Sequence, residues 1–178
     1  MTLNLMLLRH AKSDWGDPGL DDHDRPLAPR GVAAARAMGV AIAQRSLTPG
    51  RVLCSSALRA QQTWHLASQA FDPLPPMETV ETLYDFGDGE AVLDVIHQRG
   101  GTEPRLMLVC HNPAIESLAH RLTGTGEKRL RHRMREKFPT AALAIVAFES
   151  ATWAGIREAN GTLVEFLRPR DIGGPAGD

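Results

Sequence analysis

Short apolar runs of strand length alternate along the chain with longer stretches of helix length. The runs that predict β-strands are residues 3–8, 51–54, 79–83, 106–110, 141–148 and 162–167. The stretches that predict helices are residues 32–44, 57–70, 89–98 and 114–122. Strands that alternate with helices indicate an α/β fold. We therefore expect a three-layer sandwich in which helices flank a mostly parallel central sheet, without a substantial cap domain.

The chain of 178 residues is long enough for one domain with a sizeable core. We expect a single domain over residues 1–170 and a flexible tail over 171–178. Ser55 and Ser56 are a capping signal for the helix that follows them. Residues 159–161, Ala-Asn-Gly, predict a hairpin turn between the last two strands, and residues 123–140 read as a connection from helix to strand.

Composition excludes several classes of protein. The chain is 43% hydrophobic and 23% charged, which is typical of an ordinary globular protein. Its net charge of -1 argues against a dedicated nucleic-acid binder, and no apolar run is long enough to span a membrane. Without a secretory signal, a cytoplasmic location is the default expectation. Two cysteines, Cys54 and Cys110, each end an apolar run and are expected to be buried free thiols.

Charges are segregated along the chain. Residues 72–94 contain seven acidic residues and no lysine or arginine. Residues 121–137 contain seven basic residues against only Glu127 and Glu136. The basic segment could dock an acidic or phosphorylated protein, although most runs of this kind are simply solvated surface.

Three predicted strands end in polar residues suited to one kind of chemistry. Arg9 and His10 follow the first strand, Arg59 lies in the first turn of the helix after the second, and His111 follows the strand at 106–110. Ligands of open α/β sheets bind at the carboxyl ends of the strands, so these side chains should share one crevice. Two guanidinium groups can grip a phosphoryl group, and an imidazole can attack it. The other histidines lack metal-binding spacing, so we expect no metal site.

Ordered motifs resemble one family along most of the chain. Residues 7–13 (LLRHAKS), 25–31 (RPLAPRG), 55–63 (SSALRAQQT), 109–113 (VCHNP) and 137–142 (KFPTAA) together resemble the histidine phosphatase superfamily, also called phosphoglycerate mutase-like, and its SixA-type phosphohistidine phosphatases. Ala11 stands where most members have glycine. Ala28 and Cys110 replace the threonine and glycine that are common at those positions.

The resemblance implies a role for each matching residue. His10 would be the nucleophile that becomes phosphorylated, Arg9 and Arg59 would bind the phosphoryl group, and His111 would donate to its oxygens. Water would then hydrolyse the phosphohistidine intermediate, with no metal or organic cofactor. Asp85 is a candidate general acid, though its acidic surroundings make a solvated surface residue an equal reading.

Three further polar residues have weaker assignments. Ser13 is a candidate hydrogen-bond donor to the phosphate. Asn112 is expected to cap the following helix, and Asp22 to hold Arg25 or its loop.

These readings favour a phosphatase that acts on phosphohistidine in a protein of the histidine-phosphotransfer type and so serves signal transduction. Only about 35 residues separate the second predicted helix from the strand at 106–110. That leaves no room for a large lid, and an open pocket suits a protein substrate. Two alternatives remain open: a small-molecule phosphomonoesterase with the same chemistry, and a non-catalytic module that binds a phosphorylated ligand.

Overall fold

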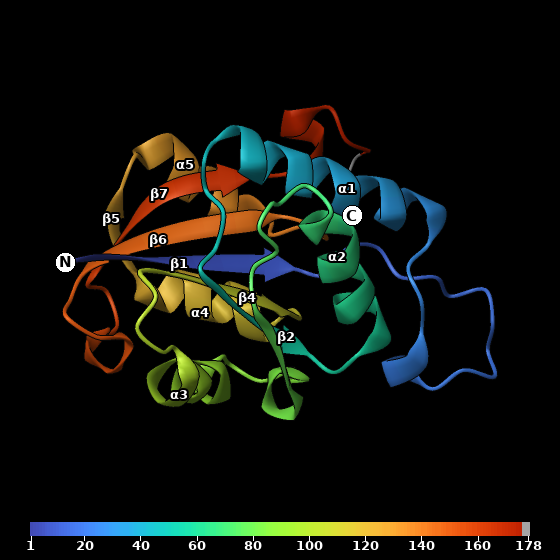
Figure 1. Ribbon diagram of the computed structural model, residues 1–178, viewed down its shortest axis with the longest axis horizontal. Helices are drawn as coiled ribbons and strands as arrows, with labels where there is room; N and C mark the ends of the chain where they lie inside the picture. Colours follow the sequence, from blue (N-terminus) through green and yellow to red (C-terminus); the bar gives the residue numbers. More distant parts are fainter. Residues whose placement is uncertain (176–178) are drawn as a thin grey trace.

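A computed structural model describes residues 1–175, and its core is one seven-stranded sheet between two layers of helices (Figure 1). The strands run in the spatial order β3-β2-β4-β1-β6-β7-β5. Their bounds are β1 Thr2–Arg9, β2 Arg51–Ser55, β3 Met77–Val80, β4 Arg105–Cys110, β5 Thr123–Gly126, β6 Leu143–Glu149 and β7 Gly161–Leu167. Strand β6 pairs antiparallel with β1 and with β7, and the other pairings are parallel. The sheet is therefore mostly parallel, as predicted.

Five α-helices cover the two faces of the sheet. They are α1 Pro29–Gln44, α2 Leu58–Ser68, α3 Glu90–Arg99, α4 Ala114–Leu122 and α5 Lys128–Glu136. Four of them match the predicted helices, but α5 and β5 lie in the segment that was read as a connection. Between α2 and β4 the chain forms only β3, the short 3-10 helix Glu81–Leu83 and α3, so this segment builds no cap domain. Within residues 1–175, no helix combines the length and apolar character needed to cross a bilayer.

Alternating side chains of the central strand fill both layers of the core. Leu3, Leu5 and Leu7 of β1 pack with buried residues of α3, α4 and α5, whereas Met6 and Leu8 pack with residues of α1 and α2 on the other face. This explains why β1 reads as a continuous apolar run, because both of its faces are buried. Its register against β4 pairs Arg9 with Cys110 and so brings the ends of the two strands side by side.

The cysteines are buried free thiols, as predicted. Burial raises the pKa of the Cys54 thiol, with the neighbouring Cys110 as a second cause. Burial likewise raises the pKa of Cys110 to about 12. Both groups are therefore packed as protonated, unreactive thiols at neutral pH.

Two connections differ from the predictions. The link between β6 and β7 is not a tight hairpin, because residues 150–160 include the 3-10 helix Trp153–Gly155. The chain forms a local turn directly before β7: Ala159 has a φ of 56°, and the Asn160 side chain accepts a hydrogen bond from the Arg157 amide (3.1 Å).

Residues 171–174, the start of the expected flexible tail, form ordered contacts. A 3-10 helix spans Pro169–Ile172, the Asp171 carboxylate binds the Arg168 guanidinium, and the Gly174 amide donates to the Pro169 carbonyl oxygen. The chain is therefore ordered beyond residue 170, because the Asp171 carboxylate and the turn closed by Gly174 hold it in place. Residues 176–178 of the predicted tail lie outside the described residues.

Candidate active site

The structure brings the four strand-end residues together at the carboxyl edge of the sheet. His10 follows β1 and His111 follows β4, with their ring centroids 4.9 Å apart. Arg59 comes from the first turn of α2, and Arg9 is the last residue of β1. The structure therefore places these side chains together at one edge of the sheet, whereas a shared crevice and their chemical roles stay predictions.

The His10 ring has a defined proton arrangement. Its Nδ1 lies 2.7 Å from the carbonyl oxygen of Ala11, which can only accept a hydrogen bond, so Nδ1 carries the proton. Burial lowers the pKa of His10 well below its usual value, and interactions of the protonated ring with His111, Arg59 and Arg9 act in the same direction. The ring is therefore neutral at neutral pH, with an unprotonated Nε2. This is the state that a nucleophilic imidazole requires.

The His111 ring is completely buried and also neutral. Its Nε2 lies 2.7 Å from the Ser55 hydroxyl, while among the described residues its Nδ1 has no hydrogen-bond partner. Burial, followed by the charge of Arg59, lowers the pKa of His111 to about 3. When the Ser55 hydroxyl donates to Nε2, the ring presents an N–H at Nδ1 for an incoming oxygen atom.

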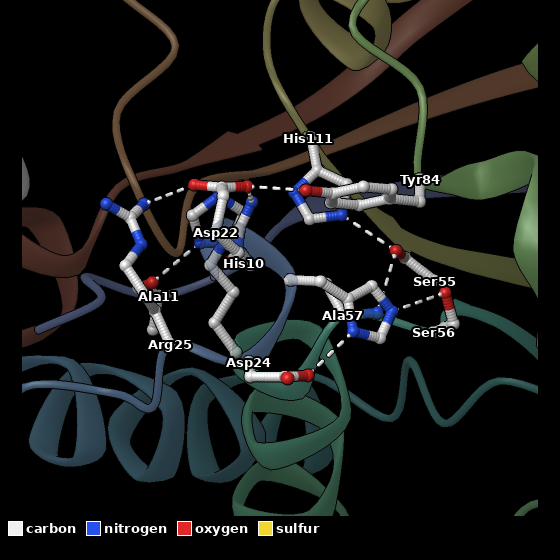
Figure 2. A network of polar contacts seen from close by, with 12 residues as sticks. His10, Ala11, Asp22, Asp24, Arg25, Ser55, Ser56, Ala57, Tyr84 and His111 are labelled. Atoms are coloured by element: carbon white, nitrogen blue, oxygen red, sulfur yellow. Dashed lines mark hydrogen bonds and ion pairs between the residues drawn. The ribbon is translucent and has the colours of Figure 1, made fainter. Parts of the chain in front are cut away.

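Asp22 holds the buried Arg59 guanidinium. The Arg59 side chain is only 2% exposed, and it donates through Nη1 to the Asp22 carbonyl oxygen (2.5 Å) and through Nη2 to the Asp22 carboxylate (2.9 Å). The same carboxylate accepts from the Tyr84 hydroxyl (2.7 Å) and pairs with Arg25 (2.8 Å), as Figure 2 shows. The predicted link to Arg25 is therefore present, but Asp22 also orients Arg59.

The Asp22 network shifts two pKa values in opposite directions. Partial burial works to raise the pKa of Asp22, but hydrogen bonds from Tyr84 and Arg59 outweigh it and hold that pKa below its ordinary value. Burial and the Asp22 carboxylate raise the pKa of Tyr84. At neutral pH Asp22 is therefore an anion, and the Tyr84 hydroxyl is a hydrogen-bond donor. Sequence reasoning missed Tyr84, whose only signal was its place directly before Asp85.

Backbone and hydroxyl contacts fix the loops around His10. Arg9 donates through Nη1 to the Phe138 carbonyl oxygen (2.8 Å), and the Ala141 amide lies 3.1 Å from the carbonyl oxygens of both Arg9 and His10. The Thr63 hydroxyl accepts from the Ala11 amide (2.9 Å) and donates to the Arg59 carbonyl oxygen (2.6 Å). Thr63 thus ties the loop of one candidate catalytic residue to the helix of another.

The weaker candidates Asp85 and Ser13 form local contacts that do not test their predicted roles. Asp85 is half-buried, and its carboxylate accepts a hydrogen bond from the Gly87 amide (3.1 Å). Ser13 is buried next to the site loop and pairs through its backbone with Leu27. The roles of Asp85 as general acid and of Ser13 as phosphate donor stay predictions.

Two capping predictions were wrong. The Asn112 amide donates to the Glu116 carboxylate (2.7 Å) instead of accepting a helix amide, and Pro113 occupies the N-cap of α4. Ala57 occupies the N-cap of α2. The Ser55 hydroxyl instead lies 2.7 Å from Nε2 of His111, and the Ser56 hydroxyl donates to the Glu81 carboxylate (2.7 Å). In both places a polar side chain binds a partner that is distant in sequence or one turn along the helix, which local patterns do not reveal.

His23 lies at the rim of the site. It is 40% exposed and its ring packs edge-on against Tyr84, with centroids 5.1 Å apart. Beside this rim is a cleft of about 360 Å³ that is lined by Trp15, Leu20, Asp22 and Arg25, among other residues. Across residues 1–175, His, Cys, Asp and Glu form no group of three or more that could hold a metal ion.

Two arginines and two neutral histidines at the carboxyl edge of a mostly parallel sheet form an arrangement suited to binding a phosphoryl group. A family model described as the histidine phosphatase superfamily (branch 1) matches residues 5–91. An uncharacterised protein of Mycobacterium tuberculosis (strain H37Rv) is 37% identical over 166 residues, which covers 92% of this chain and 100% of the relative. The chain belongs to the histidine phosphatase superfamily.

Solved structures show a similarity to SixA proteins. A crystal structure from Agrobacterium tumefaciens, whose protein is named as a phosphohistidine phosphatase SixA, superimposes with a TM-score of 0.78 at 30% sequence identity. The match covers 94% of this chain and 98% of the other. A protein histidine phosphatase SixA complexed with tungstate has a TM-score of 0.75 at 21% identity, over 96% of this chain and 99% of that one. The second comparison shows the shared fold alone.

Proposed function

We propose that the protein hydrolyses phosphohistidine in a protein substrate through a phosphorylated His10. The observation that carries the proposal is the proton arrangement of His10: Nδ1–H donates to the Ala11 carbonyl oxygen, so the Nε2 lone pair is available next to Arg59 and Arg9. The activity named for the Agrobacterium protein supports the same choice of substrate. A cytoplasmic signalling pathway is the setting that this substrate implies.

The reaction proceeds in two transfers. The Nε2 lone pair of His10 attacks phosphorus, the P–N bond of the substrate breaks, and the leaving imidazole nitrogen takes a proton from water. Water then attacks the phosphorus of phospho-His10, the P–Nε2 bond breaks, and phosphate leaves while the water proton passes to solvent. Arg9, Arg59 and an N–H of His111 stabilise the equatorial oxygens in both steps. These fixed charges supply the stabilisation that a metal ion supplies in other phosphoryl-transfer enzymes.

The lack of a cap domain among the described residues supports a protein substrate. Residues 69–104 form only one strand, one 3-10 helix and α3, so no cap domain covers the pocket in the described chain. A leaving imidazole also needs little acid assistance, because its nitrogen is readily protonated near neutral pH. The tie between Asp85 and the Gly87 amide is compatible with such a substrate.

The deciding experiment compares kcat/KM for a histidine-phosphorylated protein, a phosphohistidine peptide and a set of phosphorylated metabolites. We expect the highest value for the protein. Preference for a metabolite would establish the small-molecule phosphomonoesterase instead, and phosphate binding without any turnover would establish a binding module.

Two variants test the assigned roles. His10→Ala should abolish turnover and the phosphoenzyme trapped in alkali, whereas the control His65→Ala, at an exposed position of α2, should retain both. A phosphoenzyme that persists in His10→Ala would remove His10 as nucleophile. Asp85→Asn should slow the hydrolysis of alkyl phosphates more than that of phosphohistidine, and equal effects would exclude Asp85 as the leaving-group acid.

A further inference from the structure

Helix α5, Lys128–Glu136, is strongly basic and has no part in the proposed chemistry. Its nine residues include five lysines or arginines and one glutamate. The helix packs beside β7 at the side of the sheet where β5 forms the edge (Figure 1). Met134 is its buried anchor, and Leu130 packs partly against the same core.

The basic residues at the start of α5 oppose the stability of the helix. Lys128 and Arg129 begin the helix, where the macrodipole is positive, and no acidic residue lies in the first turn. Arg133 and Arg135 lie in the last turn, where basic residues suit the macrodipole, although Arg131 and Arg135 are like charges at i and i+4. Helix stability therefore does not explain Lys128 and Arg129.

Only some of the basic residues have structural partners. Arg133 forms an ion pair with Asp171, and Arg131 donates to the Gly124 carbonyl oxygen (3.2 Å). Lys128 and Arg135 are exposed, and the side chain of neither forms a hydrogen bond or ion pair with any other residue in the described part of the chain.

Three basic residues share one face of α5. Lys128, Arg131 and Arg135 recur at i, i+3 and i+7, and the exposed Lys137 follows directly after the end of the helix. We call these four residues the basic stripe. Lys137 directly precedes Phe138, whose carbonyl oxygen accepts a hydrogen bond from Arg9 (2.8 Å). The stripe therefore begins at the active-site loop and runs away from it.

We propose that the basic stripe docks an acidic segment of the protein substrate close to its phosphohistidine. This inference rests on the proposed function. Nine helical residues extend about 14 Å, which an extended peptide covers with about four residues. Steering by complementary charge would raise the rate of productive encounter, and the effect would weaken in salt. A protein partner is favoured over a nucleic acid because the stripe adjoins a site proposed to act on a protein.

Matched peptides test the docking directly. Two histidine-phosphorylated peptides are compared, one followed by six glutamates and the other by six glutamines. The variant is Lys128→Gln with Arg135→Gln, and the control of equal charge change is Arg36→Gln with Arg45→Gln, one exposed position in α1 and one directly after it. A generic aryl phosphate reports on the chemistry alone.

We expect the unmodified protein to prefer the glutamate peptide by about tenfold in kcat/KM at low salt, as a few exposed ion pairs provide. The ratio of kcat/KM between the glutamate and glutamine peptides should fall toward one in the stripe variant and at high salt, but should persist in the control variant. Turnover of the aryl phosphate should be the same in all three proteins.

Specific outcomes would overturn the docking proposal. The first is a preference for the glutamate peptide that is equal in the stripe variant and the control variant. The second is a stripe variant that binds single-stranded RNA more weakly but keeps its full preference for the glutamate peptide. Neither outcome affects the proposed function. Failure of both peptides while the aryl phosphate is turned over would instead contradict the protein substrate itself, and with it the docking.

Discussion

The two buried, neutral histidines should make the folded protein sensitive to mild acid. In the unfolded chain an imidazole binds a proton near pH 6.5, whereas burial and Arg59 lower the pKa of His111 to about 3 in the folded protein. Between these values the unfolded state binds a proton that the folded state does not. The stabilisation is therefore fully present above pH 6.5 and is lost as the pH falls toward 3.

The size of the effect follows from the same shift. Between pH 7.5 and 4.5, His111 alone should lower the free energy of unfolding by about 3 kcal/mol, because two of those pH units lie below 6.5 and each contributes about 1.4 kcal/mol. His10, whose pKa is also lowered, adds to the loss in the same direction. A decrease of this size is a large share of the stability of a typical domain.

Urea unfolding at a series of pH values measures this dependence. The double variant His10→Gln with His111→Gln should show a clearly flatter curve of unfolding free energy against pH. A control with two exposed histidines changed, His65→Gln and His132→Gln, should retain the full slope. Parallel curves for the unmodified protein and the His10/His111 variant would refute the assignment of both rings as neutral.

Three further results are expected. Asp22→Asn should lower the free energy of unfolding by about 1 kcal/mol at pH 7, because it removes the half-exposed carboxylate that pairs with Arg59. Since the native pKa of Asp22 is lowered, this stabilisation is present above the ordinary aspartate pKa and is lost as the pH falls through the native value, so the difference should shrink in urea titrations at acidic pH, and a constant difference would contradict the pairing. Thr63→Val should destabilise the protein by about 1–3 kcal/mol, because the buried Ala11 amide loses its acceptor; Thr63→Ser should restore it, and equal losses in both would point to packing alone. Turnover of an aryl phosphate should survive a metal chelator, since fixed cationic side chains supply the stabilising charge; loss of activity that added metal restores would exclude the proposed mechanism.

The strand ends were predictable because burial on both faces leaves a continuous apolar run that stops abruptly at a polar residue. Arg9, His10 and His111 each stand at such a stop, so the sequence marks both their position and the edge of the sheet they share. Parallel pairing of β1 with β4 then places the two histidines side by side. Helix α4, with its clear apolar face, was predicted with the bounds it has.

The parts that were missed depend on contacts between distant segments. Asp22 and Arg59 are 37 residues apart, and no local pattern shows that one carboxylate serves Arg59, Arg25 and Tyr84. Helix α5 was missed because Leu130 and Met134 are its only apolar residues, and two positions among so many charges are a weak helix signal. Packing of these two side chains, together with the Arg133–Asp171 pair, holds the helix against the sheet.

Asp22 also helps to explain how a strongly cationic site can turn over. Arg9, Arg25 and Arg59 bring three permanent positive charges to the region, while His10 and His111 remain neutral. The Asp22 anion offsets one of these charges through Arg59 and Arg25. A phosphate dianion therefore meets a nearly balanced set of charges instead of a large excess. Interactions that bind substrate, product and transition state equally would slow product release without aiding the chemistry, so this partial neutralisation favours turnover over tight product binding.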